Sequence, residues 1–299
     1  MRLDHSIKQI FIVPGIVLAM ALAGSSLSSR LILRILAGLV ASTLIACSNY
    51  VINEMLDAPF DRLHPTKSSR PAASGLVHSG WGYAQWIVMM LAGLALGSLL
   101  GRGFFFSAAA LWIMGCIYNI PPIRSKDLPY IDVLSESINN PVRFCLGWYS
   151  VVTVMLPPAS LLISYWMLGC YFMSLKRFSE YRQIADPAIA ASYRSSFAYY
   201  SEESLLNSAT FYAAACMLFF GAFMMRYRME LILSFPAIAW LMAVYFSLSF
   251  RHESAVQNPE RLYREPVLMV PLCICVALIV LLLFVNIPWI GTMFPKSTP

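Results

Sequence analysis

Nine stretches of this sequence are long and apolar enough to fill the hydrocarbon core of a lipid bilayer. They fall at residues 10–24, 31–52, 80–100, 104–120, 133–156, 159–176, 205–225, 231–249 and 266–288. Every backbone polar group inside such a stretch must be satisfied internally, and the stretches are too long and too weakly alternating for barrel strands. The sequence therefore predicts an all-α, polytopic membrane protein, a bundle of nine transmembrane helices in which residues 1–299 form one domain.

The charged residues are few and unevenly placed. Only 12% of residues are charged, and the mean hydropathy of +0.67 is that of a chain solvated mainly by lipid. Most Lys and Arg residues lie at the N-terminus and in the loops after the second, fourth, sixth and eighth stretches, whereas Arg226 and Arg228 fall on the opposite face and receive no role. Because Lys and Arg near short loops stay in the cytoplasm, we expect a cytoplasmic N-terminus and an active site on the cytoplasmic face of the inner (cytoplasmic) membrane. The net charge of +6 follows from this bias and indicates no nucleic-acid partner.

A polar row stands out at the end of the second stretch. Asn49, Asn53, Asp57 and Asp61 recur every four residues, so a helix would place them along one face, with Glu54 beside them. Oxygen-only ligands suit a hard cation, and Mg²⁺ in particular combines one or two carboxylates with phosphate oxygens of a substrate. The row therefore predicts a Mg²⁺ site that holds a phosphorylated donor.

Cationic side chains follow the row immediately. Lys67 and Arg70 can bind phosphate oxygens, Lys67 as a point charge and Arg70 through paired hydrogen bonds. Pro59 removes the amide that would bond to the carbonyl of Met55, so we expect the helix to bend close to Asp61. The alternative interpretation is a solvated cytoplasmic loop whose charges only follow the topology.

Another polar row lies in the fifth apolar stretch and just before it. Asp132, Glu136, Asn140 and Arg143 are spaced four, four and three residues apart, so they share one face of the predicted helix. Polar residues at membrane depth are costly and usually face a cavity or one another. We interpret them as substrate-binding residues in a cavity; Glu136 or Asp132 could also neutralise Arg143, and the two interpretations are compatible.

The segment N-E-x-x-D-x-x-x-D followed by R-x-H-P-T-K-x-x-R-P-x-x-x-G, which begins at Asn53, resembles the first Asp-rich motif of the UbiA superfamily of intramembrane prenyltransferases. The resemblance extends to the nine predicted helices and so to nearly the whole chain. It implies that Mg²⁺ and the diphosphate of the donor are bound by Asn53, Asp57 and Asp61, with Glu54 in place of the usual Asp as a longer acid that can still coordinate. The catalytic residues that it implies are Asp57, Asp61, Lys67 and Arg70.

Two further segments bear on the substrates. In UbiA-like proteins a tyrosine followed by a basic loop lies at the mouth of the active site, which here implies Tyr118, Arg124 and Lys126. The family also carries a second Asp-rich motif, D-x-x-Y-A-x-x-D-x-x-x-D, at the end of the sixth helix. This chain has Ser174, Lys176, Arg177 and Glu180 there instead. Cations in place of metal ligands favour a directly bound anion such as a phosphate monoester.

This exchange, the opening R-L-D-H-S-I-K-Q with Lys8, and Asp132 followed by Arg143 resemble the polyprenyl-phosphate (decaprenyl-phosphate) phosphoribosyltransferase branch of the superfamily. The resemblance implies transfer of phosphoribose from phosphoribosyl pyrophosphate to a polyprenyl phosphate. The predicted substrate-binding residues are Lys8, Tyr118, Arg124, Lys126, Asp132, Glu136, Asn140, Arg143, Lys176, Arg177 and Glu180.

Two alternatives stay open at this point. The first is transfer of a prenyl group from a prenyl diphosphate to an aromatic or lipid acceptor, which would use the same Asp-rich motif. The second is an anion transporter with Arg143 and Glu136 on the pathway, against which the lack of an evident internal repeat argues.

Overall fold

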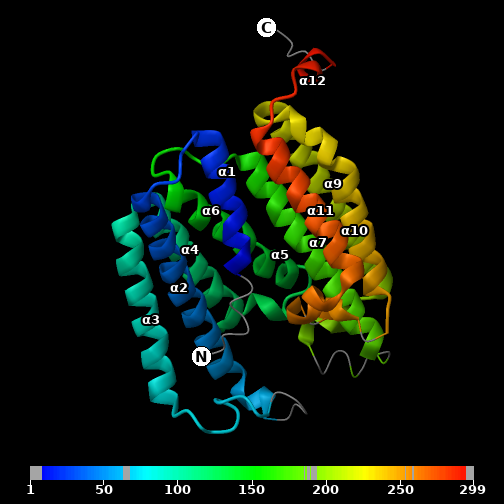
Figure 1. Ribbon diagram of the computed structural model, residues 1–299. Helices are drawn as coiled ribbons and strands as arrows, with labels where there is room; N and C mark the ends of the chain where they lie inside the picture. Colours follow the sequence, from blue (N-terminus) through cyan, green and yellow to red (C-terminus); the bar gives the residue numbers. More distant parts are fainter. Residues whose placement is uncertain are drawn as a thin grey trace. The chain divides into compact units, whose positions relative to one another are not determined.

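The computed structural model describes residues 9–62, 68–184, 186, 189, 194–252, 254–257 and 259–293, and in these residues it is helical and contains no strand (Figure 1). By its internal contacts the chain divides into two compact units, Met1–Pro157 and Pro158–Pro299. Two compact units can belong to one functional domain, so the expectation of a single domain stays a prediction.

The first unit is built on a long helical hairpin. Helices α2 and α3 pack side by side and run antiparallel (Figure 1), and α4 and α6 pack against α2. Apolar side chains such as Ile45, Phe104 and Leu146 fill the space between these helices. The elements of this unit are α1 (Val13–Ala23), α2 (Ser29–Asp61), α3 (Ser79–Leu100), α4 (Arg102–Asn119), η2 (Ser125–Asp127), α5 (Ile131–Ser137) and α6 (Asn139–Val151).

Helices α1 and α6 touch backbone to backbone through a pair of glycines. A Cβ atom added at Gly15 would lie 2.0 Å from the carbonyl oxygen of Phe144, and one at Gly147 would lie 2.1 Å from the carbonyl oxygen of Ile12. Only a residue without a side chain fits at either position, as in close helix contacts within membranes.

The fifth predicted stretch, 133–156, differs from its prediction as one helix. The structure has two helices there, α5 and α6, which meet at Ile138, and α6 ends at Val151. Pro141 has no N–H to donate to the carbonyl of Ser137, and its ring crowds that carbonyl, so the helical ladder is interrupted. Asn139 Nδ2 compensates in part by donating to the carbonyl of Glu136 at 3.1 Å.

The second unit pairs α7 with α9 along their lengths and α10 with α11. Tyr171 Oη in α7 donates to the carbonyl of Met242 in α10 at 2.8 Å, which ties the two pairs together. The side chain of Ser201 caps α9 by accepting from the amide of Ser204. The elements are α7 (Ala159–Ile184), η3 (Ser195–Tyr199), α9 (Glu202–Tyr227), η4 (Met229–Ser234), α10 (Phe235–Ser249), η5 (Ala255–Gln257), η6 (Pro259–Arg264), α11 (Pro266–Phe284) and α12 (Pro288–Met293).

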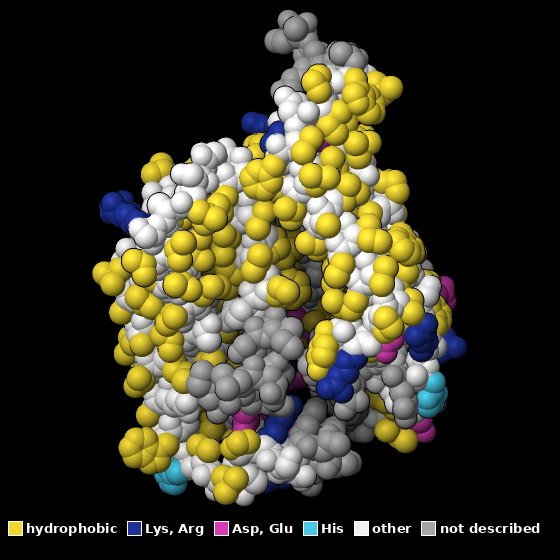
Figure 2. All heavy atoms as spheres, viewed as in Figure 1, with side chains coloured by type: hydrophobic (Ala, Val, Ile, Leu, Met, Phe, Trp, Pro, Cys, Tyr) yellow, Lys and Arg dark blue, Asp and Glu magenta, His cyan; other side chains and the backbone are white. Residues whose placement is uncertain are grey.

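The outer surface of these helices is apolar. Figure 2 shows hydrophobic side chains over most of the helical flanks, with the visible Lys, Arg, Asp and Glu side chains mainly toward the helix ends. In the described part of the chain five segments are long and apolar enough to span a membrane: Ser29–Asp61, Ser79–Leu100, Glu202–Tyr227, Met229–Ser249 and Pro266–Phe284. All nine predicted stretches fall on helices, but the count of nine spans and the cytoplasmic N-terminus stay predictions.

Candidate active site

The polar row of α2 begins with a residue that serves packing. Asn49 Nδ2 donates to the carbonyl of Leu111 in α4 at 2.8 Å. A Cβ atom at Gly115 would lie 2.1 Å from Cγ of Asn49, so this glycine makes room for the amide. Despite Pro59, α2 continues to Asp61, its last residue, because a proline in the final turn removes only one hydrogen bond.

The next two residues of the row, Asn53 and Asp57, both contact Lys126. Its Nζ donates to Asp57 Oδ1 at 2.6 Å, to Asn53 Oδ1 at 3.2 Å and to Asn119 Oδ1 at 3.2 Å. The side chain is buried, and burial lowers the pKa of Lys126 below its ordinary value, although Asp57 acts in the opposite direction. Asn53 and Asp57, one helical turn apart, therefore direct their oxygens to one point that a cation occupies.

Arg124 brings a second cation to the same carboxylate. Its Nη2 lies 3.1 Å from Asp57 Oδ1, and its Nε lies 2.8 Å from Asp127 Oδ2. The guanidinium also lies over the ring of Phe60, 5.5 Å from the centroid. The backbone of Arg124 has a φ of 31°, a left-handed conformation that a non-glycine residue adopts only when its contacts hold it there. The loop after α4 is thus folded onto the end of α2.

The loop after α2 also folds back onto the helix. Arg70 Nη1 pairs with Asp61 Oδ2 at 2.6 Å, and Asp61 is buried. Glu54 Oε1 accepts from the backbone amide of Ala72 at 3.1 Å, so one oxygen of Glu54 holds the loop. Lys67, expected to act with Arg70, lies outside the described residues, as does Lys8.

The oxygen atoms of these side chains can supply part of a Mg²⁺ site. Among the described residues no three Asp, Glu, His or Cys side chains converge on one point, because Glu54, Asp57 and Asp61 each contact a different partner. The oxygens that do converge, on Lys126 Nζ, are those of Asp57, Asn53 and Asn119, and the first two lie on the predicted row of α2. One carboxylate and one amide oxygen are a sufficient protein contribution for Mg²⁺ when bound phosphate groups supply further oxygens.

The polar residues of α5 and α6 differ in their surroundings. Asp132 is fully buried, and Glu136 and Asn140 are half-buried. Arg143 is buried, with 7% of its surface exposed, and its Nε has no hydrogen-bond partner among the described residues. None of the ion pairs between described residues joins Arg143 to Asp132 or Glu136, so simple neutralisation of Arg143 does not account for this group. A buried guanidinium with an unsatisfied Nε is suited to an oxygen acceptor on a ligand.

The end of α7, in the second unit, carries the cations predicted to bind phosphate. Arg177 Nη1 lies 3.0 Å from Glu180 Oε2, and Lys176 Nζ lies 3.9 Å from Glu180 Oε1. Burial alone would raise the pKa of Glu180, which follows the predicted membrane stretch, but Arg177, Lys176 and Arg194 together lower it. Three cations therefore act on the carboxylate of Glu180.

Sequence reasoning missed several residues that organise these groups. Asn119 accepts a hydrogen bond from Lys126. It could have been found as a polar residue in the last turn of an apolar helix, directly after Tyr118, which is half-buried. Asp127 positions Arg124. Gln257 Nε2 donates to the carbonyl and to the Oγ of Ser179, both at 3.1 Å, from a short turn without any periodic pattern.

These features define a helical, polytopic membrane protein in which amide, carboxylate and cationic side chains gather at helix ends, in a pattern suited to phosphorylated ligands. The model of the UbiA prenyltransferase family matches residues 11–272, and the chain belongs to this family. The predicted superfamily is thereby confirmed, and the chain is an integral, multi-pass membrane protein.

Solved structures share this fold over nearly the whole chain. A UbiA homologue from Archaeoglobus fulgidus bound to GPP and Mg²⁺ is 18% identical, with a TM-score of 0.68, and the match covers 94% of this chain and 97% of that one. The same homologue bound to DMAPP and Mg²⁺ is 19% identical, with a TM-score of 0.67 and the same coverage. A UbiA homologue from Aeropyrum pernix K1 is 15% identical, with a TM-score of 0.62, and the match covers 94% of this chain and 98% of that one.

One curated protein is similar in sequence over a shorter region. The uncharacterized protein y4nM of Sinorhizobium fredii is 29% identical over 110 residues, which are 37% of this chain and 21% of that protein. The match thus spans about a fifth of the length of this relative.

Proposed function

We propose that this protein is a Mg²⁺-dependent intramembrane transferase that moves phosphoribose from phosphoribosyl pyrophosphate to a polyprenyl phosphate. Membership of the UbiA family supports a transferase acting on an isoprenoid substrate, and the Archaeoglobus homologue bound to Mg²⁺ and a prenyl diphosphate supports Mg²⁺ with a diphosphate in this fold. The observation that carries the choice of acceptor is the pair Lys176 and Arg177 at the end of α7, where the resemblance leads us to expect carboxylates.

The first unit is assigned to the donor. Asn53, Asp57 and Asp61 would hold Mg²⁺, with Glu54 as a further candidate, and the bound ion would stabilise the negative charge of the leaving pyrophosphate. Arg124, Lys126 and Arg70 now contact Asp57 and Asp61. Because guanidinium and ammonium groups bind phosphate as they bind carboxylate, we assign them to the phosphate oxygens of the donor, together with Lys67.

The polar groups of α4, α5 and α6 are assigned to the rest of the donor. Asp132, Glu136 and Asn140 are assigned to hydrogen bonds from the ribose hydroxyls, and the resemblance assigns Tyr118 to the entrance. Arg143, buried with an unsatisfied Nε, is assigned to a phosphate oxygen. These contacts would fix the ribose C1 for attack, which is the larger part of what an enzyme contributes to such a substitution.

The second unit is assigned to the acceptor. Lys176 and Arg177, with Lys8 by resemblance, would hold the phosphate of the polyprenyl phosphate, and Glu180 would position the two cations of α7. A phosphate oxygen forms a bond to the ribose C1 while the bond from C1 to the pyrophosphate oxygen breaks, and pyrophosphate leaves with the electron pair. The attacking oxygen is already ionised, so no general base is needed.

A second candidate is prenyl transfer from a prenyl diphosphate to an aromatic or lipid acceptor. The GPP and DMAPP bound to the Archaeoglobus homologue favour it. It uses the same groups of α2 for the diphosphate, but it gives Lys176 and Arg177 no task.

The deciding experiment offers both donors to the purified protein with Mg²⁺. One reaction contains radiolabelled phosphoribosyl pyrophosphate and a polyprenyl phosphate, and the other contains a labelled prenyl diphosphate and aromatic acceptors. We expect label from phosphoribosyl pyrophosphate in the lipid phase, lost in Asp57→Asn and Asp61→Asn and kept in the control Glu203→Gln, which changes an exposed acid of α9. Label transferred only from the prenyl diphosphate would establish the second candidate instead.

A kinetic comparison tests the acceptor assignment separately. Replacing both Lys176 and Arg177 by Ala should raise the KM for polyprenyl phosphate and leave the KM for phosphoribosyl pyrophosphate near its original value. An unchanged KM for the acceptor would contradict the role of these cations.

A further inference from the structure

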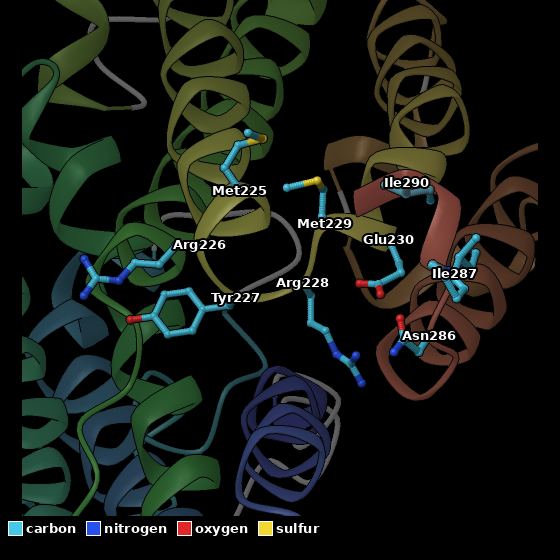
Figure 3. Close-up of a pocket in the computed structure, with 10 residues that line it drawn as sticks. Met225, Arg226, Tyr227, Arg228, Met229, Glu230, Asn286, Ile287 and Ile290 are labelled. Carbon is cyan, nitrogen blue, oxygen red and sulfur yellow. The ribbon is translucent and has the colours of Figure 1, made fainter. Parts of the chain in front are cut away.

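A cavity of about 340 Å³ opens at one end of the second unit, where α9 ends, η4 begins and α11 leads into α12 (Figure 3). Apolar side chains, including Met225, Met229 and Ile290, line part of it. Arg226, Arg228, Glu230 and Asn286 supply its charged and amide groups. None of these residues belongs to the site described above.

The candidate spans place this cavity at a membrane surface. Glu202–Tyr227 and Pro266–Phe284 end beside it, and Met229–Ser249 begins beside it. Three apolar helices that start or stop together mark the boundary of the hydrocarbon core, where lipid headgroups lie.

The cavity lies at the membrane surface opposite the phosphate-binding cations of α7. The start of α9 lies close to the end of α7, because Arg182 pairs with Glu202 at 3.5 Å. Helix α9 has 26 residues and is therefore about 39 Å long, enough to cross the bilayer. The end of α9, with Arg226 and the neighbouring Arg228, thus belongs to the other surface.

Two of the side chains that line the cavity, Arg228 and Glu230, carry opposite charges. Figure 3 shows the side chains of Arg228 and Glu230 on the same side of the cavity as Asn286, whereas Arg226 points away toward Tyr227. Arg228 Nη2 also donates to the carbonyl of Leu283 in the last turn of α11, which fixes the guanidinium at this depth. Among the ion pairs between described residues none includes Arg228 or Glu230, although both are half-buried. The cavity therefore presents a guanidinium and a carboxylate that do not neutralise each other by direct contact.

We propose that this cavity binds a zwitterionic phospholipid headgroup of the phosphoethanolamine type. The phosphodiester would accept hydrogen bonds from Arg228 and Asn286, the primary ammonium group would pair with Glu230, and the start of the acyl chains would lie on Met225 and Met229. A phosphodiester alone would use Arg228 and leave Glu230 facing an anion, whereas a headgroup with both charges matches both side chains. This proposal does not depend on the reaction that the protein catalyses.

Native mass spectrometry of the delipidated protein tests the proposal, with phosphatidylethanolamine, phosphatidylglycerol or inorganic phosphate added separately. We expect phosphatidylethanolamine to bind about tenfold more tightly than phosphatidylglycerol, a difference of about 1.4 kcal/mol. Glu230→Gln should abolish this preference, and Arg228→Met should weaken both lipids. Arg102→Met, which changes an exposed arginine of the first unit, should leave lipid binding unchanged.

Three results would overturn the proposal. Equal binding of the two lipids to the unaltered protein would remove the role of Glu230. Lipid binding that survives Arg228→Met would place the lipid elsewhere, and inorganic phosphate that displaces the lipid at equal concentration would indicate a site for free phosphate. The neutral change Glu230→Gln keeps the test decisive if Arg228→Met, which also breaks the contact with Leu283, lowers the yield of folded protein.

Discussion

The glycine contact between α1 and α6 gives the sharpest prediction for stability. In Gly147→Ala the new Cβ would lie 2.1 Å from the carbonyl oxygen of Ile12, whereas ordinary contacts of this kind begin at 3.4 Å, so the helices must separate locally by about 1.3 Å. Overpacking of this kind costs about 1–3 kcal/mol, and a gap of about 1 Å between packed helices forfeits roughly half of each neighbouring contact as well. We therefore expect a loss of about 3 kcal/mol in the free energy of unfolding.

A second substitution makes the prediction more specific. Gly15→Ala places its Cβ 2.0 Å from the carbonyl oxygen of Phe144 and requires the same separation of the helices. The double variant should consequently lose much less than the sum of the two single losses, because one movement relieves both contacts.

Thermal unfolding in detergent provides the measurement, and Gly221→Ala in α9 is the control, since a Cβ there meets no atom within 4 Å. Each single variant should lower Tm by roughly 6 °C or more, at about 2–4 °C per kcal/mol, and the control should leave it unchanged or slightly raised. Single variants with the original Tm, or losses that add fully in the double variant, would refute the backbone contact.

Two further predictions concern the proposed active site. Glu54→Gln keeps an acceptor for the amide of Ala72 but removes the charge of a candidate metal ligand, so it should raise the Mg²⁺ concentration for half-maximal turnover about tenfold. An unchanged Mg²⁺ titration would restrict Glu54 to holding the loop. Arg143→Met removes a buried guanidinium with an unsatisfied Nε, so it should raise the unfolding free energy by about 1–3 kcal/mol while lowering kcat/KM for the donor about tenfold. A lower Tm in Arg143→Met, measured beside its kinetics, would show that the guanidinium serves the fold and not the substrate.

The helices and the polar row of α2 could be predicted because both follow from local periodicity. Nine apolar stretches lie on helices, and Asn53, Asp57 and Asp61 lie on one helix, as their spacing of four indicates. The interruption at Pro141 was not predicted. Pro59 falls in a last turn, where it costs one hydrogen bond, whereas Pro141 falls in the first turn of α6, where the ladder from α5 is interrupted.

Most ion-pair partners of the site residues could not be predicted from the sequence. The contact between Lys126 and Asp57 joins residues that are 69 positions apart, and no pattern near either residue encodes it. The pair Arg177 and Glu180 is different, because a spacing of three on a helix brings side chains together and could have been predicted. Interpreting both as separate substrate ligands overlooked that proximity.

Helix α2 is longer than the hydrocarbon core of a bilayer is thick. A helix of 33 residues is about 50 Å long, and the hydrocarbon core is about 30 Å thick, so roughly 20 Å of α2, about thirteen residues, extends past the lipid tails. Thirteen residues counted back from Asp61 reach Asn49, the start of the polar row. The polar row of α2 thus reaches the level of the lipid headgroups. In the proposed reaction, the sugar-phosphate donor can approach this row from the water while the isoprenoid tail of the acceptor stays in the hydrocarbon core.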